Sequence, residues 1–303
     1  MSRNSRTAVA MVAMGSIIFG FLGIPVRSLN AAGLDSMDLV MIRSVLSAIG
    51  LILITLVVDR SAFRISGKRD IILFILFGLS KFLCDISYVY AQLTIDLSVS
   101  TLLLMTSPYY VLVFSFLMFS ERITKHKVAA VFIGFLGCVL VTNVLGGDIG
   151  SINIFGTVCA ALSGLFFSLY VVFSRVCTDR GNSPLTTILY AFIIEAVLSI
   201  PFADLGLVSG VIVQTGPLMD LTVMVVLMTI IPYYIETWGI QRLTPSIVAI
   251  LGMLELVTAC IVGYVFFGES MTTLNALGMG LIIASILLID LMPGPSVKDD
   301  ISD

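Results

Sequence analysis

Glu236 lies in the segment P-Y-Y-I-E-T-W, where aromatic residues surround an acidic side chain: Tyr233, Tyr234 and Trp238. A carboxylate flanked by aromatic rings can hold an ammonium group, because the faces of the rings carry negative charge density. The segment therefore predicts contact with a cationic solute through Glu236, Tyr234 and Trp238. A second interpretation places Glu236 and Trp238 at the boundary between an apolar helix and solvent, with Arg242 as the partner of the carboxylate.

Lys81 and Asp85 stand four residues apart in an apolar segment, so a helix places both on one face. Tyr88 continues that face towards the end of the segment, either as a ligand or as an interface aromatic. The two charges are either a mutually neutralised pair that joins helices or direct contacts for a solute. We count Lys81, Asp85 and Tyr88 among the substrate-binding candidates.

Two further acids, Glu195 and Glu255, lie deep inside apolar segments, too far from the ends for a short side chain to reach water. Glu255 is a candidate for substrate binding and for proton coupling, and Glu195 is either a proton site or a structural hydrogen-bonding group. Pro108 interrupts another apolar segment. Because proline frees a backbone carbonyl and bends a helix, Pro108 is a candidate gate, with a static kink as the alternative.

The elements that must position these residues are membrane helices. The chain of 303 residues is 58% hydrophobic and only 12% charged, whereas a soluble domain carries about 25% charged residues. A bilayer core needs about 20 helical residues to cross it. Ten segments qualify, which predicts an all-α fold of ten transmembrane helices: 7–29, 38–58, 70–91, 97–119, 127–145, 152–177, 185–206, 219–240, 245–267 and 272–291.

The chain also repeats itself at a spacing of 148 residues. Four pairs of positions carry the repeat: Phe19 and Phe167, Arg27 and Arg175, Glu121 and Glu269, Thr124 and Thr272. We therefore expect two five-helix repeats, 1–148 and 149–292, followed by a disordered cytoplasmic tail, 293–303. At the ends of helices, Thr124 and Thr272 are expected to act as caps, and Glu121 and Glu269 are expected to accept amides of the next helix.

The distribution of charge predicts that the repeats are inverted. Loop 59–70 is basic, whereas its counterpart 207–218 holds no Lys or Arg. Since basic loops stay in the cytoplasm, the two halves cross the membrane in opposite senses, which is usual for secondary transporters. Thirteen of the 16 basic residues fall on one side. We expect a multi-pass protein of the inner (plasma) membrane with both termini cytoplasmic.

Three motifs resemble those of the EamA family in the drug/metabolite transporter superfamily. They are F-G-F-L-G-I-P-V-R, M-T-S-P-Y-Y through F-S-E-R-I-T, and L-G-M-L-E-L-V through F-F-G-E-S-M-T. Pro108, Glu121 and Thr124 match the family spacing, while Leu256 stands where a second proline is usual, and Phe19 stands where the family usually has Trp. The similarity extends over residues 7–291.

The resemblance implies a ten-helix basket in which helices 1, 3, 4, 6, 8 and 9 line a central cavity and solute moves by alternating access. Tyr109, inside the second motif, joins the substrate-binding candidates.

Enzyme and channel functions fit the sequence less well. His126 is the only histidine, so no pair of histidines can hold a metal, and we expect neither a metal nor a cofactor. No nucleophile elbow and no selectivity-filter loop occur. The net charge of -3 gives no reason to expect nucleic acid or anionic lipid head groups as partners. The expected partners are the lipid bilayer and a small-molecule solute, for a monomer or homodimer.

The deep charges favour a solute that carries a positive charge. Four deep acids outnumber the two deep bases: Asp85, Glu195, Glu236 and Glu255 against Lys81 and Arg43. Because Lys81 could also meet a carboxylate, an amino acid or an amino-acid-derived zwitterion or cation fits this balance. The alternatives are a carrier for a nucleobase, nucleoside or drug-like cation, and a membrane scaffold without flux.

Overall fold

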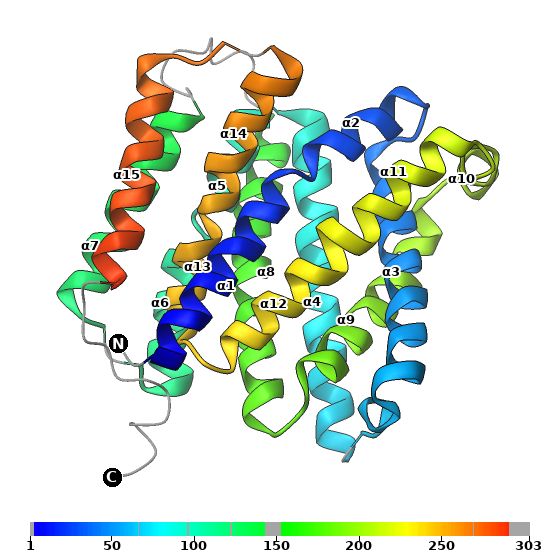
Figure 1. Ribbon diagram of the computed structural model, residues 1–303, viewed down its shortest axis with the longest axis horizontal. Helices are drawn as coiled ribbons and strands as arrows, with labels where there is room; N and C mark the ends of the chain where they lie inside the picture. Colours follow the sequence, from blue (N-terminus) through cyan, green and yellow to red (C-terminus); the bar gives the residue numbers. More distant parts are fainter. Residues whose placement is uncertain are drawn as a thin grey trace.

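The computed structural model is a bundle of helices, with no strand in the part of the chain that it describes (Figure 1). The described residues are 3–65, 67–95, 97–121, 123–142, 153–268 and 270–290. Glu269 and the tail 293–303 lie outside them. The α-helices are α1 (Arg3–Gly20), α2 (Gly23–Ala31), α3 (Ser36–Val58), α4 (Lys68–Thr94), α5 (Leu97–Leu104), α6 (Ser107–Phe119), α7 (Lys125–Val141), α8 (Ile154–Asp179), α9 (Pro184–Ser199), α10 (Leu205–Ile212), α11 (Thr215–Val225), α12 (Ile231–Ile240), α13 (Pro245–Gly252), α14 (Leu254–Phe267) and α15 (Thr273–Asp290).

Eight helical stretches among the described residues are long and apolar enough to cross a membrane. They are Ser5–Ala31, Met37–Val58, Lys68–Ala91, Val99–Phe119, Ile154–Asp179, Pro184–Phe202, Gly216–Ile240 and Pro245–Phe267. Two of the ten expected spans fall short of this length, since α7 has 17 residues and the apolar part of α15 covers only Thr273–Leu288. The all-helical membrane fold is confirmed, and length alone does not establish the count of ten.

Several expected helices are interrupted, and proline explains most of the interruptions. Pro25, Pro108 and Pro232 cannot donate a backbone hydrogen bond, and each ring crowds the carbonyl four residues earlier. The first span accordingly breaks between α1 and α2, and the fourth breaks between α5 and α6. Before Pro232 the helix widens into a π-helical turn, η4 (Val226–Ile230). Residues 207–218, expected to be a plain loop, instead carry most of α10 and the start of α11.

The two threonine caps expected from the sequence are present. The Thr124 hydroxyl accepts a hydrogen bond from the Lys127 amide at 3.3 Å, and that of Thr272 accepts one from the Asn275 amide at 3.2 Å. The Glu121 carboxylate differs from expectation, because it accepts a bond from the Lys127 side chain at 2.7 Å rather than from an amide. The caps fix the starts of α7 and α15.

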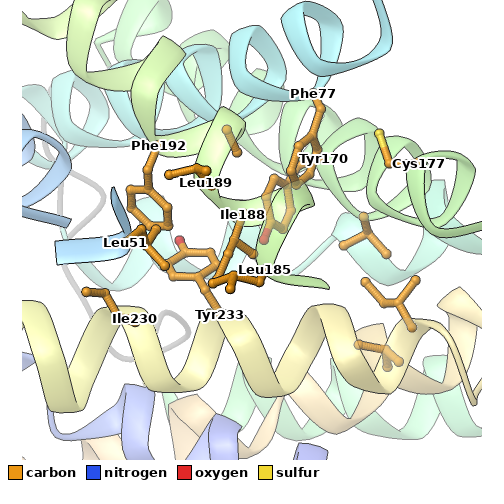
Figure 2. Close-up of a cluster of buried hydrophobic side chains, with 14 of the residues drawn as sticks. Leu51, Phe77, Tyr170, Cys177, Leu185, Ile188, Leu189, Phe192, Ile230 and Tyr233 are labelled. Carbon is orange, nitrogen blue, oxygen red and sulfur yellow. The ribbon is translucent and has the colours of Figure 1, made fainter. Parts of the chain in front are cut away.

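The centre of the bundle is packed with aromatic and branched side chains from α4, α8, α9 and α12 (Figure 2). The Tyr170 ring stacks on Phe77 with centroids 4.7 Å apart, and Tyr233 meets Phe192 edge-to-face at 5.2 Å. To one side, α7 and α15 touch through backbone, since a Cβ on Gly137 would lie 2.7 Å from the Gly278 carbonyl oxygen. This tight packing supports the polar side chains described below.

Candidate functional site

A cavity of about 1030 Å³ lies among α1, α2, α3, α4, α12 and α14. Its lining includes Val12 and Val248, and also Asn30 and the connection 270–272 between α14 and α15. In Figure 1 that connection and α2 are at the top of the bundle, while the start of α4, next to the basic loop 59–70, is at the bottom. The lining of the cavity therefore reaches the end of the bundle opposite the basic loops.

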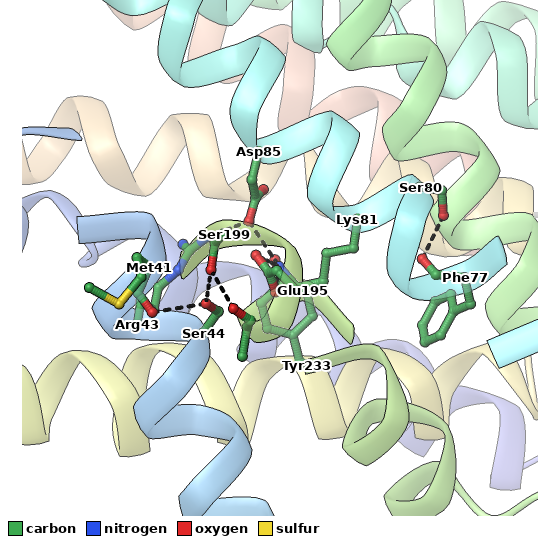
Figure 3. A network of polar contacts seen from close by, with 11 residues as sticks. Met41, Arg43, Ser44, Phe77, Ser80, Lys81, Asp85, Glu195, Ser199 and Tyr233 are labelled. Carbon is green, nitrogen blue, oxygen red and sulfur yellow. Dashed lines mark hydrogen bonds and ion pairs between the residues drawn. The ribbon is translucent and has the colours of Figure 1, made fainter. Parts of the chain in front are cut away.

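Four charged side chains form a network beside the cavity (Figure 3). The Asp85 carboxylate accepts hydrogen bonds from Arg43 Nη2 at 2.6 Å and from Lys81 Nζ at 3.0 Å, and both contacts are ion pairs. Lys81 Nζ also lies 3.1 Å from the Glu195 carboxylate and donates a hydrogen bond to the Tyr233 hydroxyl at 3.2 Å. Two cations thus face two anions, and the network as a whole is neutral.

Helical spacing and packing bring these groups together. Lys81 and Asp85 are one turn apart on α4, whereas Arg43 comes from α3 and Glu195 from α9. The Lys81 ammonium also sits over the Tyr233 ring, 4.5 Å from its centroid. Since removing one charged member would strand a buried charge, the network ties α3, α4 and α9 together, and Tyr233 adds α12.

Exposure divides the network into an outer and an inner pair. Arg43 and Asp85 line the cavity with side chains 14% and 15% exposed, whereas Lys81 and Glu195 are 2% and 0% exposed. The Nε of Arg43 is buried and has no hydrogen-bond partner among the described residues. A solute in the cavity can therefore meet Arg43 and Asp85 directly, and Lys81 and Glu195 only through them.

Glu236 and Glu255 line the same cavity from other helices. No hydrogen bond or ion pair joins either carboxyl group to another described residue, unlike every other deep acid. Glu236 lies one turn beyond Tyr233 on α12, and Glu255 lies in the first turn of α14, directly after the break at Met253.

Aromatic rings surround the space near these acids. The Phe19 ring meets Tyr233 edge-to-face at 4.9 Å, and Phe167 stacks on Tyr170 at 5.9 Å. Phe19, Phe167 and Tyr233 all line the cavity. Phe19 and Phe167 occupy equivalent positions of the 148-residue repeat, so each repeat contributes one ring.

The other candidates from the sequence are distributed unevenly. Tyr88 lines the cavity, with its hydroxyl 2.9 Å from that of Thr101. Tyr109 instead packs edge-to-face on Phe135 at 5.4 Å, and Tyr234 is 41% exposed on the outside of the bundle. Neither of these two residues lines the cavity.

Trp238 and Pro108 also lie off the cavity wall. The Arg242 guanidinium lies over the Trp238 ring at 4.0 Å and donates to the Trp238 carbonyl oxygen at 3.0 Å, so it is not the partner of Glu236. Pro108 is buried at the start of α6. The cavity residues that sequence reasoning left out of the site include Arg43, Phe19 and Phe167. The repeat at Phe19 and Phe167 was a usable signal for two of them.

Arg175 lies at the basic end of the bundle. Its Nη1 donates to the carbonyl oxygens of Ile240 at 2.6 Å and Leu243 at 3.2 Å, and its Nε bonds Asp179 at 2.8 Å. These contacts tie the end of α8 to the turn between α12 and α13. The equivalent residue in the first repeat, Arg27, lies at the opposite end over the Phe267 ring at 4.1 Å.

Comparisons with known proteins agree with this architecture. An "Uncharacterized transporter" of Archaeoglobus fulgidus is 24% identical over 94% of this chain and 97% of its own length. The "Threonine/homoserine exporter RhtA" of Escherichia coli K12 is 26% identical over 46% of this chain and 47% of its own. A solved structure, 17% identical, superposes with a TM-score of 0.77 over 94% of this chain and 98% of that one, which shows the fold alone.

The family comparison covers most of the chain in two matches. The EamA-like transporter family matches residues 6–143 and, a second time, residues 154–290. The apolar helices and the central cavity are what a multi-pass transporter of small solutes requires. The chain belongs to the EamA-like transporter family.

Proposed function

We propose that this protein is a secondary-active carrier for a small organic solute with an amino group, most simply an amino acid or a compound derived from one. The observation that carries the proposal is the pair Glu236 and Glu255, two carboxyl groups that line the cavity without a partner. An unpaired carboxylate in a membrane is costly, so a cationic group or a proton must balance it during the cycle.

Other residues that line the cavity suit the carboxylate and the side chain of such a solute. The Arg43 guanidinium lines the cavity and has donors beyond the one bound to Asp85, so it can donate to a carboxylate group of the solute. The rings of Phe19, Phe167 and Tyr233 offer faces to an ammonium group or to an apolar side chain. A volume of about 1030 Å³ is ample for an amino acid, since ligand cavities span about 300–1,000 Å³. The name of the relative RhtA, a threonine/homoserine exporter, supports the same class of solute.

For coupling, we propose that Glu255 and Glu236 exchange a proton for the solute cation. Glu195 was the other candidate from the sequence, but Lys81 lies 3.1 Å from its carboxylate. A carboxylate that already has a cation needs no proton for neutrality. Glu195 is therefore assigned to the network that ties the helices together.

For orientation, we propose two inverted five-helix repeats, 1–148 and 149–292, with α7 and α15 as the fifth helix of each. The basic loops then face the cytoplasm and the cavity is open to the outside of the plasma membrane. Arg175, at the cytoplasmic end, holds that end shut by its bonds to Ile240 and Leu243. Alternating access requires these bonds to break when the cavity opens inward.

The test is counterflow into proteoliposomes. Vesicles loaded with an unlabelled amino acid should take up the labelled form faster than empty vesicles, and the rate should saturate. Glu255→Gln should abolish this stimulation without changing the amount of folded protein. Glu121→Gln, which alters a carboxylate at a helix end outside the cavity, is the matched control and should retain counterflow per folded molecule. Full counterflow in Glu255→Gln would remove Glu255 from the site, and stimulation only by nucleosides or drug-like cations would reject the amino-acid class.

A further inference from the structure

A second hollow lies at the basic end of the bundle, remote from the central cavity. It has a volume of about 550 Å³ and is bounded by the start of α4 and the ends of α6 and α8. Its walls are apolar and are formed by Ile72, Leu73, Met118, Phe119 and Val176. Its rim carries three charged residues, Arg69, Asp179 and Arg180. We refer to it as the α4–α6–α8 groove.

The walls of the groove face the surroundings of the bundle rather than its core. Ile72 is 57% exposed and Met118 is 51% exposed, while Leu73, Phe119 and Val176 are half-buried. In a membrane-spanning bundle such a surface meets lipid tails, and a groove between helices can hold one acyl chain along its length.

The rim is net positive, because its acids are already neutralised. Arg180 Nε bonds Asp70 at 2.5 Å, and Asp179 is bound by Arg175 at 2.8 Å. Arg69 is exposed and has no hydrogen bond or ion pair with another described residue. The Arg180 side chain is 39% exposed, and the guanidinium has donors beyond the one that binds Asp70. Arg69 and the outer edge of Arg180 are thus left to receive an anion.

The two arginines are not part of the repeated scaffold. At the repeat spacing of 148 residues, Pro217 stands in the place of Arg69, and Ala32 stands in the place of Arg180. The equivalent position at the opposite end of the bundle therefore lacks both cations. The charge at this groove belongs to one face of the membrane only.

We propose that the α4–α6–α8 groove binds one anionic phospholipid, with its phosphate on Arg69 and Arg180 and an acyl chain along Ile72 and Met118. Basic pockets between transmembrane helices are suited to anionic head groups, which concentrate at the cytoplasmic leaflet. Phosphate accepts paired hydrogen bonds from guanidinium groups, which matches the two arginines at the rim. The site involves no residue of the central cavity and does not depend on the identity of the transported solute.

Native mass spectrometry of the purified full-length protein tests this proposal directly. Phosphatidylglycerol, or phosphatidylcholine with the same acyl chains, is added to the protein in detergent. The detergent is then removed in the spectrometer, and the lipid that stays bound is measured. The parent should retain one phosphatidylglycerol in preference to phosphatidylcholine, and Arg69→Gln should weaken this binding about fivefold. Arg69 is exposed and unpaired, so its substitution should not perturb folding. Arg64→Gln, which removes another exposed basic residue outside the groove, is the matched control and should bind as the parent does.

A second variant tests the apolar wall. Ile72→Glu places a carboxylate where the acyl chain would lie and should abolish retention of the lipid, with the melting temperature as the check on folding. Equal retention of the two lipids by the parent would overturn the proposal. So would an equal loss in Arg64→Gln and Arg69→Gln, because the arginines would then act only through general surface charge.

Discussion

Replacing Lys81 by methionine should destabilise the protein through Glu195. Lys81 Nζ is 3.1 Å from the Glu195 carboxylate, which is fully buried, and no other cation among the described residues contacts it. Asp85, by contrast, retains Arg43 at 2.6 Å. Lys81→Met therefore strands one buried carboxylate while it leaves one complete ion pair.

The expected loss follows from the cost of an uncompensated buried charge. Breaking a buried pair by removing one partner costs about 3–5 kcal/mol. At about 2 °C per kcal/mol for a protein of this size, the melting temperature should fall by about 6–10 °C. Adding Glu195→Met removes the stranded charge, so the double variant should recover most of the loss, since replacing both partners by apolar side chains is often close to neutral.

Thermal unfolding in detergent measures these changes in melting temperature, with all variants in the same buffer and at the same protein concentration. Lys68→Met, which removes an exposed lysine at the start of α4, is the control and should change stability by less than about 0.5 kcal/mol. If the double variant melts as low as Lys81→Met, the charge balance described here is refuted. An unchanged melting temperature in Lys81→Met would refute the burial of the pair as well.

Further predictions concern the gate, the helix end and the acids of the cavity. Arg175→Gln removes charged hydrogen bonds worth about 1.5–3 kcal/mol each, and these bonds are proposed to hold the basic end of the bundle shut. A cysteine at Ser246 should therefore react with maleimide from that end at least about tenfold faster, and an unchanged rate would exclude this role of Arg175. Glu121→Gln removes the ion pair with Lys127 and should lower the melting temperature without changing the dissociation constant of the solute, and a weaker affinity would place Glu121 in the transport pathway. Lowering the pH should weaken binding of an amine, since protons compete with the amine for Glu236 and Glu255. The double variant Glu236→Gln/Glu255→Gln should lose this pH dependence, and an affinity that changes with pH as steeply as in the parent would contradict the role of these two acids.

Local pattern was enough to predict several features of the molecule. The helical spacing of Lys81 and Asp85 predicted their contact, and the threonines at 124 and 272 were recognisable as caps. The apolar runs predicted the positions of the helices, because the bilayer fixes the length of a span. These features depend on residues close together in the chain.

Contacts between distant helices could not be predicted from the sequence alone. Glu195 meets Lys81 across 114 positions, and Arg43 meets Asp85 across 42. Which face of a helix points inward is also a tertiary property. Tyr233 faces the cavity, whereas its neighbour Tyr234, rotated by about 100° on the same helix, faces outward.

A structure of the protein with a transported amine bound would test the central claim most directly. The amino nitrogen should lie about 2.7–3.2 Å from a carboxylate oxygen of Glu236 or Glu255, with Phe19, Phe167 or Tyr233 against the solute. A solute bound in the cavity with its amino group turned away from both carboxylates, or bound elsewhere in the bundle, would contradict the account.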